Sequence, residues 1–138
     1  MHDSTEKMLM FLNGTAMSGL ADHVHVVGSR FLGPCRTAAS YRFYAVRDEY
    51  PGLVEDGEHG ASILGELYEI DRATWQERLL PNEPTELVPG IVVLEDGAEA
   101  NVMLLELSRV PPGDKVVDIA DFGSWRAYLA HLAEQGSS

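Results

Sequence analysis

Apolar residues run without a break from Met8 to Leu12 and then give way to a loop of small residues, Asn13 to Gly19. Five consecutive apolar positions that stop at turn-forming residues predict a buried β-strand followed by a turn. Two more strands are predicted over residues 31–37 and 41–47. The second of these strands has apolar residues on both faces, which is typical of a barrel or of a sheet covered on both sides.

The segment between the first two predicted strands has two interpretations. Leu20, Val24 and Val27 recur at helical spacing, whereas residues 23–26 alternate as in a strand. We favour a short helix here.

Residues 50–70 are predicted to hold one strand after an irregular stretch. Tyr50-Pro51-Gly52 is expected to break the preceding pattern, and residues 55–60 form a polar loop of the kind that joins strands. The strand itself is predicted over Ala61 to Ile70. Gly65 inside it indicates a bulge or the close approach of a ligand.

A helix is predicted directly after this strand. Asp71 is a suitable N-cap, Trp75 and Leu79 would form the buried side, and Pro81 is expected to end the helix. The connector that follows contains Pro84 and is expected to be irregular.

The last third of the chain predicts a hairpin and a helix. Asp96-Gly97, flanked by apolar residues 90–95 and 101–107, is a strong hairpin signal. A helix is predicted over residues 124–135, capped by Ser124, with Trp125 on its buried face together with Leu129 and Leu132. We therefore expect an α+β fold: a small, mainly antiparallel β-barrel with peripheral helices.

Length and composition indicate one small globular domain. The 138 residues suit a single domain over 1–138, with the barrel core over about 8–107 and the C-terminal helix over about 124–135. The formal charge of −12 repels phosphate backbones and anionic lipids, which argues against nucleic-acid and membrane partners. The chain shows no membrane span and no basic leader, so we expect a cytoplasmic protein that acts alone or as a small oligomer such as a homodimer.

The loop after the first strand is the first candidate site. The backbone N–H groups of Gly14, Thr15, Ala16 and Met17 could converge on a carboxylate, because consecutive amides form a concave donor site. Asn13-Gly14 could equally make only a tight turn.

Glu83 is the candidate general acid/base. It follows the predicted helix among apolar neighbours that could bury it and raise its pKa. The alternative is a solvated loop glutamate. Glu86, Glu66 and Glu69 compete for the same role, although Glu66 and Glu69 would point to opposite faces of a regular strand.

Other reactive residues give weaker signals. His23 and His25 would share one face of a strand, but no third ligand lies at a recognisable spacing, so we expect structural histidines and no metal. Ser18 lacks the sequence of a hydrolase nucleophile. Cys35 is expected to be an inert thiol, because only Arg36 beside it would lower its pKa.

Three stretches in succession resemble the gamma-glutamylcyclotransferase-like superfamily. They are Leu12-Asn13-Gly14-Thr15-Ala16, then Gly65-Glu66-Leu67-Tyr68-Glu69-Ile70-Asp71, then Leu80-Pro81-Asn82-Glu83, and Tyr50-Pro51-Gly52-Leu53 also fits. The resemblance covers about residues 8–107. Asn13 stands where the family has tyrosine and Ala16 where it has leucine, which implies an altered pocket.

Other stretches resemble the C-terminal domain of allophanate hydrolases, which has the same fold. They are Arg36-Thr37-Ala38, Tyr41-Arg42-Phe43-Tyr44-Ala45, Pro51-Gly52-Leu53 and Pro84-Thr85-Glu86-Leu87-Val88-Pro89-Gly90. The amidase part of such enzymes is absent from this sequence.

The two resemblances imply different functions. The first implies an enzyme that releases an amine from a γ-glutamyl amine or amide and forms 5-oxoproline, with loop amides holding the substrate carboxylate and Glu83 moving a proton. Such a reaction needs no cofactor, because the ring closure is intramolecular. The second implies a noncatalytic module that binds a small acid or assists assembly with a partner enzyme.

Overall fold

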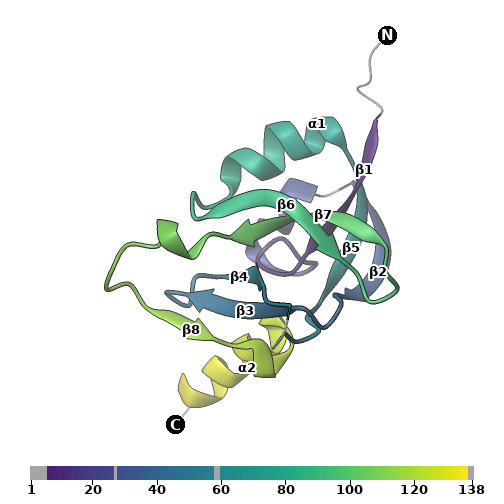
Figure 1. Cartoon of the computed structure of the whole chain (residues 1–138). Coiled ribbons are helices and arrows are strands. Elements are labelled where there is room, and N and C mark those ends of the chain that lie inside the picture. Colours follow the sequence, from purple (N-terminus) through teal and green to yellow (C-terminus); the bar gives the residue numbers. More distant parts are fainter. Residues whose placement is uncertain (1–5, 27, 58–59, 137–138) are drawn as a thin grey trace.

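The computed structural model describes residues 6–26, 28–57 and 60–136, and its strands form one curled sheet (Figure 1). The eight strands are arranged in the order β2-β5-β1-β7-β4-β3-β8, and β6 pairs with β7 outside this path. Their bounds are β1 Lys7–Leu12, β2 Arg30–Arg36, β3 Tyr41–Val46, β4 Tyr50–Glu55, β5 Leu64–Asp71, β6 Leu87–Val93, β7 Glu99–Leu105 and β8 Val116–Asp118.

Most strand pairs are antiparallel, as expected. The exceptions are β1 with β7 and β4 with β7, which are parallel. With helical segments at its edges, the curled mixed sheet confirms the predicted α+β class and its barrel-like architecture. No helix in the described ranges is long and apolar enough to cross a bilayer.

The helical segments are short and lie outside the sheet. A 3-10 helix, η1 (Ala21–Val26), follows the loop after β1 and agrees with the short helix favoured for this region. After β5 the chain forms α1 (Arg72–Thr74), the π-helical η2 (Trp75–Leu79) and the 3-10 turn η3 (Leu80–Asn82). Two further 3-10 turns, η4 (Leu107–Arg109) and η5 (Ala120–Phe122), precede the C-terminal helix α2 (Trp125–Gly136).

The core lies inside the curled sheet and is closed on one side by α2. Trp125 is 2% exposed at the start of α2, and the backbone N–H of Ala127 donates to Ser124 Oγ at 3.1 Å, so the predicted N-cap is confirmed. The largest fully buried side chains include Phe11, Phe43, Met10, Leu53, Ile63, Ile70, Leu79 and Ile119.

Two sequence predictions were wrong at prolines. Tyr50-Pro51-Gly52 does not break the sheet but begins β4, with Pro51 opposite Ala45 of β3. Proline is tolerated there because β4 meets β7 only at Leu53, so the missing N–H removes no ladder bond toward β7. Pro81 does not end the helical segment, because it stands in the first turn of η3, where a proline needs no N–H partner.

Asp71 occupies the N-cap position of α1, as predicted, but its side chain does not make the capping bond. Its carboxylate instead accepts a hydrogen bond from Lys7 Nζ at 2.5 Å. The reason is the register of β1 and β5, which places Lys7 directly opposite Asp71.

Gly65 marks a close approach of two strands of the chain. A Cβ atom at this position would lie 2.4 Å from the carbonyl oxygen of Leu12 and 2.6 Å from the ring of Phe11. Glycine thereby lets β5 pack tightly against the end of β1, where the candidate loop begins.

Candidate functional site

A cavity opens where β1 and β4 separate from each other along the same edge of β7. β1 pairs with β7 at Met10 and Asn101, and β4 pairs with β7 at Leu53 and Leu104. The end of β1, the start of β4 and Met103 of β7 surround a space that neither β1 nor β4 fills.

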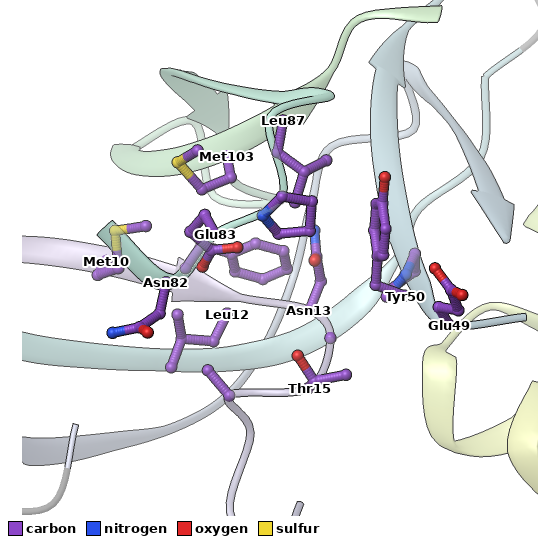
Figure 2. Close-up of a pocket in the computed structure, with 15 residues that line it drawn as sticks. Met10, Leu12, Asn13, Thr15, Glu49, Tyr50, Asn82, Glu83, Leu87 and Met103 are labelled. Carbon is purple, nitrogen blue, oxygen red and sulfur yellow. The ribbon is translucent and has the colours of Figure 1, made fainter. Parts of the chain in front are cut away.

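The cavity has a volume of about 140 Å³ and is lined by four parts of the chain (Figure 2). These are the end of β1 with its loop, the β3–β4 turn with the start of β4, the stretch from the end of η3 to the start of β6, and Met103 of β7. The lining residues are Met10, Phe11, Leu12, Asn13, Gly14, Thr15, Ala16, Glu49, Tyr50, Pro51, Asn82, Glu83, Pro84, Leu87 and Met103.

The loop after β1 contributes four of these residues, Asn13 to Ala16. Gly14 is required by packing, because a Cβ atom there would lie 2.8 Å from Cδ of Pro51. Met17 does not reach the cavity: its backbone N–H donates to the Gly14 carbonyl at 3.1 Å, and its side chain is 2% exposed in the core. Of the predicted loop residues, Asn13 to Ala16 therefore line the cavity and Met17 does not.

Glu83 reaches the same cavity from the opposite side. The helical segment ends at Asn82, and Glu83 adopts an extended backbone while its N–H still donates to the Leu80 carbonyl at 3.1 Å. Its side chain is half-buried and lies near Asn82 and Leu12 in Figure 2. The structure thus brings the predicted acid/base and the predicted loop together in one cavity.

Glu86, the first rival of Glu83, is committed to a buried hydrogen-bond network. It is 8% exposed, and it accepts hydrogen bonds from Tyr50 Oη and from Arg47 Nη1 and Nη2, the two guanidinium nitrogens at 3.3 and 3.2 Å. These bonds, with that from Arg47 the largest cause, lower the pKa of Glu86, while burial and the adjacent carboxylate raise the pKa of Tyr50. Glu86 is therefore a structural carboxylate that orients Tyr50, which itself lines the cavity.

The turn that carries Arg47 is strained. Arg47 and Asp48 have φ values of 53° and 57°, in the left-handed region that most residues avoid. Side-chain bonds hold both residues there: Asp48 accepts from Tyr128 Oη at 2.6 Å and from Lys115 Nζ at 2.8 Å, and Arg47 also donates to Asp114 at 2.9 Å. The turn is thus fixed next to Glu49 and Tyr50 of the cavity wall.

Glu66 and Glu69, the other rivals, do not line the cavity. Glu66 is buried and holds the far end of the loop, because it accepts hydrogen bonds from Ser18 N–H at 2.8 Å and from Ser18 Oγ at 2.9 Å. Glu66 also accepts hydrogen bonds from Tyr68 Oη at 3.0 Å and from Arg126 Nη2 at 3.1 Å. Burial alone would raise the pKa of Glu66, but the four hydrogen bonds together lower it.

The role assigned to Glu86 predicts an acid-dependent loss of stability. A carboxylate with a lowered pKa in the folded state stabilises the protein above its unfolded value of about 4.5 and loses that contribution as the pH falls through the folded pKa. Glu86→Gln is expected to be less stable than the native chain at pH 7, and the difference is expected to shrink between about pH 5 and pH 3. Urea unfolding of both proteins at several pH values between about 7 and 3 measures the difference in their free energies of unfolding. A difference that stays constant with pH would contradict the assignment.

Of the remaining reactive residues, His23 and Cys35 do not line the cavity in the described chain. His23 Nδ1–H donates to the Ala16 carbonyl at 3.0 Å and so supports the candidate loop from behind, while the side chain of His25 lies outside the described residues. No group of three metal-binding side chains occurs in the part of the chain that the structure describes. Burial and the carboxylates of Asp96 and Glu95 raise the pKa of Cys35, in agreement with the predicted inert thiol.

Sequence reasoning missed the second wall of the cavity. Glu49 and Tyr50 line it, yet the stretch around Pro51 was interpreted only as a break between strands. The available signal was Tyr50-Pro51-Gly52-Leu53 itself, which the superfamily resemblance includes.

Comparisons with known proteins agree with this fold. The chain aligns with a uropathogenic E. coli-specific protein at 32% identity and a TM-score of 0.82, over 91% of this chain and 98% of that one. It also aligns with the Kluyveromyces lactis allophanate hydrolase at 24% identity and a TM-score of 0.82, over 92% of this chain but only 22% of that enzyme. An AIG2-like protein from Mus musculus shares the fold at 18% identity and a TM-score of 0.57, over 78% of this chain and 81% of that one.

A search of curated proteins found no match. The family described as the allophanate hydrolase C-terminal domain matches residues 8–130, which is most of the chain. The fold is the one expected for gamma-glutamylcyclotransferase-like proteins, and the chain belongs to the allophanate hydrolase C-terminal domain family.

Proposed function

We propose that this protein is a cyclotransferase-type enzyme that acts on a γ-glutamyl amine or amide. The observation that supports this most directly is the single cavity shared by Glu83 and the loop residues Asn13 to Ala16. A proton carrier and a group of neutral donors on opposite sides of one small cavity are what an intramolecular acyl transfer requires.

The reaction proposed needs only these groups. The loop amides hold the α-carboxylate of the substrate, and Glu83 takes a proton from the α-ammonium group. The freed amine attacks the γ-carbonyl carbon, a C–N bond forms, and the carbonyl electron pair moves to oxygen. When the tetrahedral intermediate collapses, the original C–N bond breaks and the departing amine receives the proton from Glu83. Glu83 then removes the second proton from the positively charged ring nitrogen, which leaves the neutral lactam N–H, and passes it to the departing amine, which leaves as an ammonium. The products are 5-oxoproline and a free amine, with no water or cofactor consumed.

The charge of the cavity supports an amine-bearing substrate. Glu49 and Glu83 are acidic, and no lysine, arginine or histidine is among the residues that line the cavity in the described chain, although Glu49 is paired with Arg47 outside the cavity lining at 2.9 Å. The negative charge that Glu83 brings to the cavity attracts an ammonium group.

The alternative function is that of a noncatalytic module that binds a small acid or assists assembly. Family membership favours this alternative, because the chain corresponds to only 22% of the Kluyveromyces lactis enzyme, and Asn13 departs from the tyrosine of the cyclotransferase loop. A binding module would keep the cavity without turnover.

The test is incubation of the purified chain with a panel of γ-glutamyl amines, amides and dipeptides, with 5-oxoproline measured by mass spectrometry. We expect release of 5-oxoproline together with one equivalent of amine from at least one member. Absence of release across the whole panel would exclude the enzymatic function and leave the binding module.

A further inference from the structure

One buried polar atom in the cavity has no partner. Among the buried side-chain nitrogen and oxygen atoms of the described residues, only Nδ2 of Asn13 makes no hydrogen bond. Asn13 lines the cavity that also holds Glu83. In Figure 2 its side-chain amide is drawn between Glu83 and Tyr50.

The other two asparagines of the chain show that this is unusual. Nδ2 of Asn82 donates to the Arg78 carbonyl at 2.6 Å, and Nδ2 of Asn101 donates to the Leu9 carbonyl at 2.9 Å. A buried N–H without an acceptor costs free energy, because it has lost water and gained nothing. Asn13 therefore carries a donor that the ligand-free fold does not use.

The surrounding charge indicates which acceptor fits this donor. Glu83 places negative charge on the cavity, Glu49 is paired with Arg47 at 2.9 Å, and none of the lining residues in the described chain is basic. In the proposed function the backbone amides of Gly14 to Ala16 already bind the substrate carboxylate, so the acceptor that remains for the Asn13 amide is an uncharged carbonyl oxygen of the same substrate. An amide donor suits such an oxygen, and it becomes more favourable when negative charge develops there.

We propose that the side-chain amide of Asn13 donates a hydrogen bond to the carbonyl oxygen of the amide that reacts, and stabilises the oxyanion formed from it. This inference rests on the proposed function, in which the backbone amides of Gly14 to Ala16 hold the substrate carboxylate. Asn13 is then a catalytic residue of this chain at the position where the superfamily has tyrosine.

The connector that begins with Glu83 and Pro84 forms part of the cavity wall beside Asn13. A hydrogen bond that a ligand oxygen makes to Asn13 Nδ2 inside this wall forms away from competing water.

Asn13→Ala and Asn101→Ala form a matched pair for the kinetic test. Asn13→Ala is expected to lower kcat about 10²- to 10³-fold with KM nearly unchanged, and not to lower the melting temperature, because it removes an unsatisfied donor. Asn101→Ala is expected to do the reverse: it removes the bond to Leu9 and lowers the melting temperature while kcat is retained. An Asn13→Ala variant with native kcat would overturn the inference.

A binding readout separates this inference from the proposed function. In a titration of ¹⁵N-labelled protein with 5-oxoproline, the side-chain NH₂ resonances of Asn13, identified by their loss in Asn13→Ala, are expected to shift downfield. If they shift while the native chain releases no 5-oxoproline from any substrate, the proposed function fails and the role of Asn13 as a carbonyl donor is kept. Asn13 resonances that stay fixed, whether or not the backbone signals of Gly14 to Ala16 move, would overturn the inference.

Discussion

Replacing Glu83 by glutamine is expected to lower the rate of 5-oxoproline release about 10²- to 10⁴-fold, the usual contribution of a positioned general acid/base. Glutamine keeps the size and the polar contacts of the side chain but cannot accept a proton from the substrate ammonium. The loss is expected in kcat, because the proton is moved in the step that makes and breaks bonds.

A control at Glu77 makes the test specific. Glu77 is exposed on η2, in the helical segment that leads to Glu83, and Glu77→Gln makes the same change of charge outside the cavity. Its activity is expected to match that of the native chain, and circular dichroism should show both variants folded. A folded Glu83→Gln variant with more than about a tenth of native activity would exclude Glu83 as the proton carrier.

Removing the indole of Trp125 is expected to have the largest effect on stability. Trp125 is 2% exposed where α2 packs against the core, and truncation of a buried aromatic side chain to alanine costs about 3–5 kcal/mol through lost contacts and the void that remains. Because domains of this kind are stable by only about 5–15 kcal/mol, much of the folding free energy would be lost. Urea unfolding followed by circular dichroism measures the change.

Phe122 provides the comparison for Trp125. It lies on η5 just before α2, is 37% exposed, and contacts the rings of Tyr128 and His131 at centroid distances of 5.3 and 5.0 Å. Phe122→Ala is expected to cost about 1 kcal/mol, because less of its surface leaves water on folding. Equal losses in the two variants would show that α2 is not held to the core through Trp125.

The sequence was sufficient to predict the strands and helices whose start and stop signals lie within the element itself. The apolar run of Met8 to Leu12, the Asp96-Gly97 turn and the cap at Ser124 each contain their own start or stop, and the structure confirms the strand, the hairpin and the helix that they predict. The α+β class with a barrel-like sheet followed from their order.

The predictions that were wrong concern residues whose structure depends on contacts between segments distant in the sequence. Pro51 is accepted in a strand only because β7 does not pair with β4 at that point, and the side chain of Asp71 is occupied by Lys7 of another strand. In the same way, the partners of Glu86, Arg47 and Tyr50, lie 39 and 36 residues away in the sequence, so the residues next to Glu86 do not predict them. Sequence order indicated Glu83 and the Asn13 loop as candidates, and their catalytic roles stay predictions.

The separation of β1 and β4 along β7 has a consequence for stability. Each of the two strands pairs with β7 through a single register pair, so the group of β1, β5 and β2 and the group of β4, β3 and β8 reach β7 at two separate points. A molecule in the cavity would touch residues of both groups. Because such a molecule binds only the folded arrangement, it raises the melting temperature by mass action. Thermal stabilisation of the native chain is therefore a direct way to search for its natural ligand.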